Sequence, residues 1–175
     1  LYEIVYNEIP KELLPPYHRL AGQWLEFMAQ RRNHDVSIEV AHHFDLGEDY
    51  AHAALYHIDI GVRALKLYAT QRAITHLEEG LGNIDKNLVQ KRSKGLRELA
   101  EAYILDGQYE KAIERLEEVL DISWQMGLRI LAGEVYIRMG WIYFLMRDFE
   151  KALSSMKNGH TLHQESMYER GVSTA

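Results

Sequence analysis

The sequence contains no cysteine, and its three prolines, Pro10, Pro15 and Pro16, all lie within the first 16 residues. The absence of cysteine excludes disulfide bonds and thiolate ligands for a metal ion. Residues 17–175 therefore contain no proline, the residue that most strongly interrupts helices. No apolar run approaches the roughly 18 residues that a membrane span requires, and no secretory signal pattern is present. We therefore expect a cytoplasmic protein that does not enter a membrane.

Positive charge is scarce as well: the formal net charge is −6 and the isoelectric point is near 5.8. A broad nucleic-acid-binding surface requires an excess of basic residues, so this balance argues against one. The basic stretch Gln90–Arg97 lies on a predicted helix among acidic residues. We interpret it as a solvated helix face and expect no nucleic-acid partner.

Sequence motifs for catalysis are missing too. No segment matches the phosphate-binding loop G-x-x-x-x-G-K-[ST], and no serine occupies a G-x-S-x-G turn. We therefore expect no enzymatic activity, no catalytic residues and no cofactor in this chain.

The nine histidines do not show the spacing of a metal site. His52 and His57 are five residues apart, whereas two ligands on one helix face are four apart. Glu39-x-x-His42 matches half of a di-iron carboxylate motif, but no second such pair is present. We expect the histidines to pack or hydrogen-bond between helices, and we predict no metal site.

From Tyr17 onward, apolar residues recur at spacings of three and four, which predicts helices throughout. The predicted helices are Pro16–Arg31, Asp35–Leu46, Asp49–Leu67, Thr70–Ile84, Leu88–Leu105, Gln108–Met126, Leu128–Met146 and Phe149–His163. Three glycines are expected to close helices in the left-handed conformation, and three aspartates to cap the helices that follow. These residues are Gly47, Gly107, Gly127, Asp49, Asp106 and Asp148.

A pattern of small and aromatic residues returns along the chain. Leu96-x2-Leu99-Ala100-x2-Tyr103 is followed by Ala112-x3-Leu116, and the same arrangement recurs 40 residues later from Tyr136. Weaker copies begin at Ser37 and His57, and in every copy the step from the last motif position of the first helix to the alanine of the second is nine residues. The predicted packing residues are Ala41, Phe44, Ala53, Gly61, Ala73, Leu99, Ala100, Tyr103, Ala112, Leu116, Tyr136, Gly140, Tyr143 and Ala152.

This pattern resembles the tetratricopeptide repeat, W-x2-L-G-x2-Y followed by A-x3-F. The tryptophan and the closing proline of that template are absent, and the last two copies are 40 residues apart instead of about 34. The resemblance implies an all-α, right-handed solenoid of antiparallel helical hairpins with about eight helices.

A second resemblance covers Ile4 to Ile84. The stretches "IVYNEIPKELLPPYHRLAGQWLE" and "VAHHFDLGEDYAHAALYHIDIGVRALKLYATQRAITHLEEGL" resemble the segment after the winged-helix domain in bacterial signal-transduction ATPases with numerous domains, a class that includes the maltose-regulon activators and ATPase-fused nucleotide cyclases. The resemblance implies that residues 1–8 are the tail of a winged helix. We expect this tail and a connector at residues 1–16, atypical linker helices at 17–87, two long repeats at 88–165 and a frayed tail at 166–175. Because the first residue is Leu1, we expect a piece of a longer protein.

The first helices of successive repeats line the concave side of such a solenoid, and that side forms a binding surface. Trp141 is not required by the packing pattern, so it either anchors a partner beside Arg97 or packs against a further helix. The predicted partner or ligand groove consists of Lys94, Arg97, Glu101, Ile104, Glu134, Ile137, Trp141 and Phe144.

The absence of catalytic motifs and the predicted groove favour a non-enzymatic binding module, and the second resemblance implies that it is the regulatory arm of a signalling ATPase. The expected partner is a protein or peptide, with the upstream ATPase domain of the same chain and a small-molecule inducer as further candidates. The alternative is a structural segment that self-associates and has no separate ligand. An exposed apolar face after Tyr143–Met156 would favour this alternative, because helical repeats need polar caps.

Overall fold

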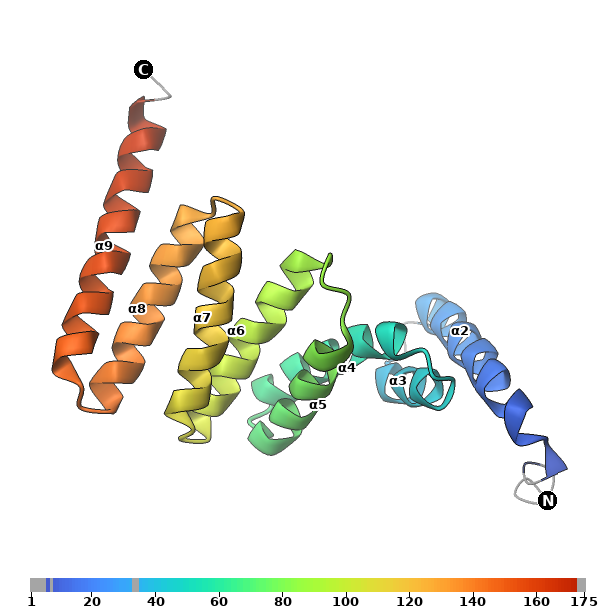
Figure 1. Cartoon of the computed structure of the whole chain (residues 1–175). Helices are drawn as coiled ribbons and strands as arrows, with labels where there is room; N and C mark the ends of the chain where they lie inside the picture. The colour runs from blue at the N-terminus through green and yellow to red at the C-terminus, as the bar shows by residue number, and fades with distance from the viewer. Residues whose placement is uncertain (1–5, 7, 33–34, 173–175) are drawn as a thin grey trace. The chain divides into compact units, whose positions relative to one another are not determined.

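The computed structural model describes residue 6 and residues 8–32 and 35–172, and all regular structure in these parts of the chain is helical (Figure 1). A short 3-10 helix precedes eight α-helices, which confirms the predicted all-α fold. The elements are η1 (Lys11–Leu13), α2 (Leu14–Arg32), α3 (Ser37–Leu46), α4 (Tyr50–Lys66), α5 (Thr70–Asn83), α6 (Val89–Leu105), α7 (Tyr109–Gln125), α8 (Arg129–Leu145) and α9 (Phe149–Val172).

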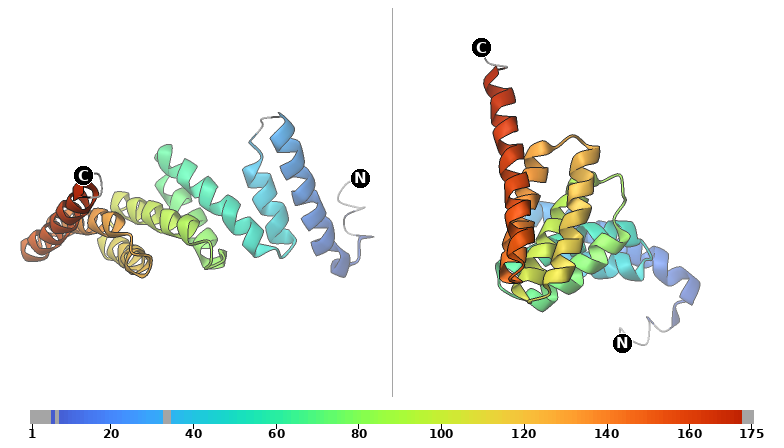
Figure 2. Two further views of the ribbon diagram at one scale, coloured as in Figure 1. Left: turned by 90° about the horizontal axis from the view of Figure 1, so that it is seen from above. Right: turned by 60° about the vertical axis from the view of Figure 1, so that its left-hand side comes forward.

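The helices form two compact units, Leu1–Leu88 and Val89–Ala175, called here the N-terminal unit and the C-terminal unit. Consecutive helices pack against each other within each unit. In the C-terminal unit, for example, α8 and α9 lie side by side and antiparallel (Figure 2). Among the described residues, no helix is both long and apolar enough to cross a membrane. The finer division of the chain into a connector, linker helices and repeats stays a prediction.

The first long helix begins earlier than predicted. Because α2 starts at Leu14, Pro15 and Pro16 lie in its first turn and not in a connector. Proline is tolerated at this position, since the first N–H groups of a helix have no acceptor within the helix. Most of the predicted winged-helix tail at residues 1–8 lies outside the described residues.

The last helix is longer than predicted. α9 continues beyond His163 as far as Val172, so the segment expected to fray is helical up to that residue. No proline or glycine interrupts residues 164–170, and a helix pattern without such a signal can continue. Residues 173–175 lie outside the described part of the chain.

Five of the connections between helices are three-residue turns of one kind. The middle residue has a positive φ, and the N–H of the third residue donates to the carbonyl five residues earlier, as in the Schellman motif. The middle residues are Glu48, Tyr68, Gly107, Gly127 and Arg147. The N···O distances are 2.8–2.9 Å for Asp49 to Phe44, Ala69 to Ala64, Gln108 to Tyr103, Leu128 to Ser123 and Asp148 to Tyr143.

These turns correct two of the predicted helix-end residues. Gly47 has a φ of −81°, because Glu48 is the left-handed residue of that turn. Gly47 is needed for a different reason, since a Cβ there would lie 3.0 Å from the backbone nitrogen of Arg19 on α2. Asp106 does not cap α7, because the N-cap position belongs to Gln108.

Two hairpins depend on glycines for the close approach of their helices. Gly61 and Gly80 lie at the contact of α4 with α5, and Gly140 and Gly159 lie at the contact of α8 with α9. A Cβ at Gly159 would come within 2.8 Å of the carbonyl oxygen of Gly133. The α4–α5 hairpin, which has one of the weaker repeat patterns, is therefore packed as closely as the clear copy in α8–α9.

All the predicted packing residues of both units are buried except Tyr136 and Tyr143, which are half-buried. The similarity of the two repeats extends to the residues around Tyr103 and Tyr143. Lys111 lies over the ring of Tyr103 at 5.3 Å from its centroid, and Lys151 lies over the ring of Tyr143 at 5.5 Å. The two hairpins of the C-terminal unit are thus alike in detail, and they can be compared position by position.

Candidate functional site

The facing sides of α6 and α8 in the C-terminal unit carry charged residues that pair with each other. Arg138 Nη2 lies 2.5 Å from Glu101 Oε2, and Arg97 Nη1 lies 3.7 Å from Glu134 Oε2. Each helix supplies one cation and one anion four residues apart, so the two pairs cross the same cleft. Exposed ion pairs of this kind contribute little stability, about 0.2–1 kcal/mol each. Their main consequence is that each of the two arginines in the cleft faces a carboxylate of the opposite helix.

This first cleft has a volume of about 320 Å³. Its floor is apolar and its walls are charged. The lining residues are Arg97, Glu98, Ala100, Glu101, Leu116, Glu134, Val135 and Arg138.

A second cleft, of about 410 Å³, lies on α8 and α9. It is lined by Glu134, Ile137, Arg138, Trp141 and Met156. Four of these residues stand 40 positions after residues of the first cleft: Ile137 after Arg97, Arg138 after Glu98, Trp141 after Glu101 and Met156 after Leu116. The second cleft is therefore the same site one repeat later, with apolar residues in place of the ion-paired Arg97 and Glu101.

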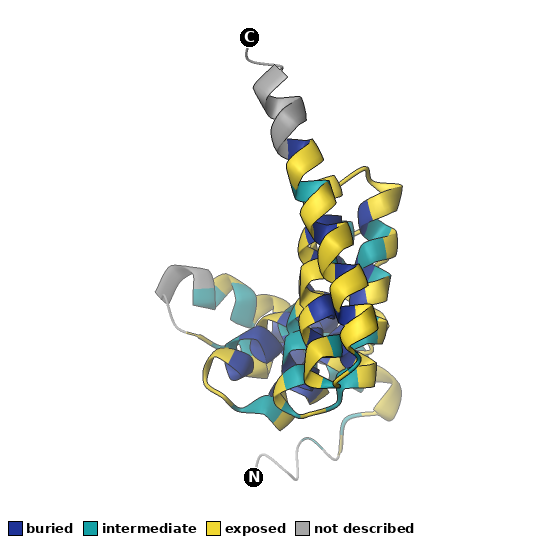
Figure 3. Ribbon diagram, turned by 90° about the vertical axis from the view of Figure 1, so that its left-hand side faces the viewer, coloured by how far each residue is buried: buried dark blue, intermediate teal, exposed yellow. Residues whose placement is uncertain are grey.

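Exposure shows what differs between the two repeats. Leu116 is 2 % exposed, because α8 covers that side of α6 and α7, whereas its counterpart Met156 is 36 % exposed. Phe149 and Leu153, about two turns and one turn before Met156 on α9, are 60 % and 56 % exposed. The outer side of α9 is largely exposed (Figure 3). No described helix lies on α8 and α9 as α8 lies on α6 and α7.

Aromatic side chains extend this apolar surface toward the turn between α8 and α9. Trp141, 47 % exposed, stacks on Phe144 with 5.6 Å between ring centroids. Phe144 in turn meets Phe149 edge to face at 5.8 Å. We call Ile137, Trp141, Phe144, Phe149, Leu153 and Met156 the α8–α9 apolar face.

The structure divides the predicted groove residues among several places. Arg97, Glu101 and Glu134 line the first cleft, and Glu134, Ile137 and Trp141 line the second. The others, Lys94, Ile104 and Phe144, line neither cleft.

Arg138 is a site residue that the sequence analysis missed. It lines both clefts, and it is the basic residue in the cleft of Trp141, where Arg97 was expected. The signal for it was present, because Arg138 follows Glu134 by four residues and so lies on the same helix face.

Histidines of the N-terminal unit join helices by hydrogen bonds, as predicted. His18 of α2 and His43 of α3 lie 2.9 Å apart through their Nδ1 atoms, and the Tyr6 hydroxyl lies 2.8 Å from His18 Nε2. Burial lowers the pKa of His18, and neighbouring His43 and His42 lower it further. The pKa of His43 is also lowered, chiefly by burial and then by His42.

A second histidine pair joins α4 to α5. His57 Nδ1 lies 2.9 Å from His76 Nδ1, and His57 Nε2 lies 3.0 Å from Asp45 Oδ2 of α3. Burial lowers the pKa of His76, and His57 adds to this effect. Among the described residues, His57, His76 and Glu79 form a group that could hold a metal ion.

Comparison with known proteins supports a repeat fold. Residues 92–163 match the family model of the tetratricopeptide repeat. The crystal structure of the apo form of RapI is similar, with a TM-score of 0.61 and 15 % identity over 95 % of this chain. The chain covers 47 % of the RapI chain, so it spans about half of that length. BtubC from P. vanneervenii is 19 % identical over 90 % of this chain and 59 % of its own, with a TM-score of 0.49.

No curated protein matches the sequence. At the identity found with RapI, likeness establishes the fold and nothing further. The helical repeat fold is confirmed. Residues 92–163 are therefore similar to tetratricopeptide repeats, within an all-helical repeat fold.

Proposed function

We propose that this chain is a non-enzymatic protein-binding module and that its α8–α9 apolar face holds an amphipathic helix of a partner protein. The observation that carries the proposal is the replacement of Arg97 and Glu101 by Ile137 and Trp141 at equivalent positions of two neighbouring repeats. A repeat module commonly binds proteins or peptides through such surfaces.

The first cleft supplies a template for the occupant of the second. There the covering element is a helix, α8, which directs Glu134 and Arg138 at the charged residues of α6. A helix in the same position on α8 and α9 would meet Ile137 and Trp141 instead. Burying an unpaired charge against these side chains is costly, so the partner helix should carry apolar residues where α8 carries Glu134 and Arg138.

Trp141 is the expected anchor of this interaction. Tryptophan is enriched among the residues that contribute most to binding energy, and the stacked Phe144 holds its ring in place. Exposed apolar patches of this kind commonly mark interaction sites.

A helical peptide based on residues 128–146 tests the docking geometry. Its outward face is made polar for solubility, and it is prepared in two forms: one keeps Glu134 and Arg138, and the other has leucine at both positions. We expect the leucine form to bind the wild-type chain more tightly. In the double variant Ile137→Arg, Trp141→Glu, which recreates the first cleft, the preference should reverse. Failure of both peptides to bind, or an unchanged preference, would contradict helix docking.

For the biological role, we propose the regulatory arm of a multidomain signalling ATPase, on the strength of the resemblance over residues 4–84. A partner helix would act as a switch only if it bound one state of the ATPase more tightly than another. Titration of this chain with such an ATPase and winged-helix segment, with and without ATP, measures that difference. Equal binding with and without ATP would contradict the switch while leaving the docking site in place.

Self-association is the second candidate, and the exposure of Phe149 and Leu153 favours it. An exposed apolar face of a helical repeat can pack against a second copy. Sedimentation equilibrium of the wild-type chain and a Leu153→Glu variant distinguishes the cases. A dimer that the substitution dissociates supports self-association, and a monomer at high concentration contradicts it.

A further inference from the structure

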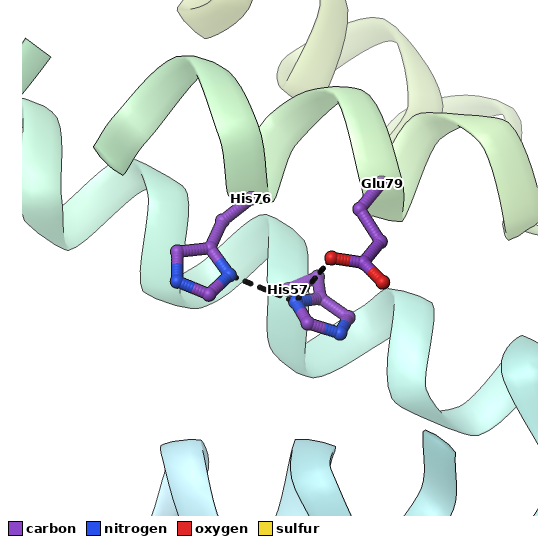
Figure 4. A group of neighbouring side chains, drawn as sticks. All are labelled: His57, His76 and Glu79. Carbon is purple, nitrogen blue, oxygen red and sulfur yellow. Dashed lines mark hydrogen bonds and ion pairs between the residues drawn. The ribbon is translucent and has the colours of Figure 1, made fainter. Parts of the chain in front are cut away.

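Two helices of the N-terminal unit bring together two histidines and a glutamate that are distant from the α8–α9 apolar face in sequence. His57 of α4 is buried, His76 of α5 is half-buried, and Glu79 lies one turn further along α5 (Figure 4). Each offers one ligand atom, and these atoms all lie within 4.8 Å of one another. Imidazole nitrogens and a carboxylate oxygen are a donor set that suits zinc.

The hydrogen bond to Asp45 determines which nitrogen of His57 is available. An ionised carboxylate only accepts hydrogen bonds, so His57 Nε2 must carry the hydrogen that it donates to Asp45 Oδ2 over 3.0 Å. In neutral His57 the lone pair is then on Nδ1, the atom that faces His76 and Glu79. A carboxylate that orients a histidine through its far nitrogen is the usual outer-shell partner of a histidine metal ligand.

We propose that His57 Nδ1, His76 Nδ1 and Glu79 form a Zn²⁺ site, oriented by Asp45 and with one position left for water. Bonds of about 2.0–2.1 Å in a tetrahedral site place neighbouring ligand atoms about 3.3 Å apart. The observed separations bracket this value: 2.9 Å between the two Nδ1 atoms and 3.8 Å from His57 Nδ1 to Glu79 Oε2. Because all three ligand atoms lie within 4.8 Å of one another, they need to approach by about 1.5 Å at most, and Glu79, whose side chain is 46 % exposed, has room to make the larger movement.

The proposed ion would join α4 to α5 directly and α3 through Asp45. With the ion bound, both Nδ1 atoms would coordinate it. Without the ion, the two Nδ1 atoms share a single hydrogen between them. The site is separate from the proposed helix-docking face, so either proposal can fail without the other.

Isothermal titration calorimetry of the metal-free full chain with Zn²⁺ tests the site, and thermal unfolding is then measured with and without the ion. We expect one ion per chain and a rise in the thermal unfolding temperature of the N-terminal unit. Co²⁺ used as a spectroscopic substitute should give the intense visible absorption of a tetrahedral complex with nitrogen and oxygen ligands.

Three substitutions locate the ion. His76→Gln and Glu79→Gln remove ligands at partly exposed positions, so the variants should fold, and each should weaken Zn²⁺ binding at least 10-fold. Asp45→Asn leaves the ligands in place but should lower affinity about 10- to 100-fold, as removal of an orienting carboxylate usually does. The matched control is His52→Gln, an exposed histidine on α4 whose Nδ1 bonds to Asp49.

Two results would overturn the proposal. One is the absence of a one-to-one Zn²⁺ complex in the folded wild-type chain. The other is binding that survives both His76→Gln and Glu79→Gln but is lost with His52→Gln, which would identify adventitious binding to surface histidines. If His57→Ala were tested and failed to fold, the two α5 substitutions would still decide the outcome.

Discussion

Glu101 of α6 accepts a hydrogen bond from Arg138 of α8 across the first cleft of the C-terminal unit. Forty residues after Glu101, the equivalent position holds Trp141, whose ring is open to solvent on one side. The two hairpins therefore have the same backbone arrangement, but they differ in the side chains that would face a following helix. The surface of α6 offers charges that pair with charges of α8, whereas the equivalent surface of α8 and α9 is apolar and favours a helix that buries it.

Trp141→Ala should weaken binding of a partner helix with little loss of helicity. The ring contacts Phe144 and solvent, so its removal should cost less than about 1 kcal/mol of stability, while loss of a tryptophan anchor costs about 2 kcal/mol or more of binding energy. Circular dichroism and anisotropy of a labelled peptide measure the two effects. Trp124→Ala, at an exposed tryptophan of α7, is the control and should leave affinity unchanged. If the Trp141→Ala chain were unfolded, the role of Trp141 would be in packing and not in binding, which would contradict the prediction.

Arg147→Gly should stabilise the C-terminal unit. Arg147 has a φ of +63°, a conformation that costs an L-residue about 1 kcal/mol and glycine almost nothing. The side chain is exposed, so little else is lost. Urea denaturation should show a gain of about 1 kcal/mol, and Gly107→Ala, the reverse change in the equivalent turn, a similar loss. A loss in both variants would contradict the shared turn geometry.

Gly80→Ala should destabilise the N-terminal unit by about 1–3 kcal/mol, the usual cost of overfilling a close contact. The added Cβ would lie 2.9 Å from the carbonyl oxygen of Ala54 and 3.0 Å from the backbone nitrogen of Ile58. Gly82→Ala on the same helix is a matched control, because nothing lies within 4 Å of its Cβ position. Thermal unfolding of both variants provides the comparison. Equal effects at the two positions would mean that α4 and α5 can move apart without cost.

The N-terminal unit should lose stability in acid. The pKa values of His18 and His43 are lowered in the folded state, so below the unfolded value of about 6.5 the unfolded chain binds more protons. The free energy of unfolding should therefore be constant above about pH 7 and fall as the pH drops below 6.5. Urea denaturation between pH 7.5 and pH 5, at roughly half-unit steps, measures this slope.

His43→Gln tests the assignment of that slope. The substitution removes one titrating group and relieves His18 of a charged neighbour, so the dependence on pH should become shallower. A slope unchanged by His43→Gln would assign acid sensitivity to other groups.

Much of the fold follows from local sequence signals. The apolar spacing predicts all eight helices, because a helix must bury one face whatever it packs against. The turns at Gly107 and Gly127 follow from the freedom of glycine to adopt positive φ. Glu48, Tyr68 and Arg147 occupy the same conformation without a glycine signal, because the packing of the flanking helices fixes those turns.

The candidate sites were less accessible to sequence reasoning. The groove prediction placed Trp141 beside Arg97, but Arg97 pairs with Glu134 and Arg138 lies in the cleft of Trp141. Which charges meet across two helices depends on their axial offset, and no single helix pattern contains that quantity. The cluster of His57, His76 and Glu79 was also hidden, because His57 lies on α4 and the other two residues lie on α5, across the turn that joins these helices.

The sequence by itself determined the helices, the step of nine residues between motif positions of paired helices, and the repeated positions that bury alanine and glycine, since these depend on interactions within a few turns of chain. Only the tertiary structure decided which residues of separate helices face each other. It showed that Ile137 and Trp141 repeat the site of an ion-paired cleft, and that two histidines converge on one glutamate. The physical reason is that side-chain distances between helices are set by how closely and at what offset the helices pack.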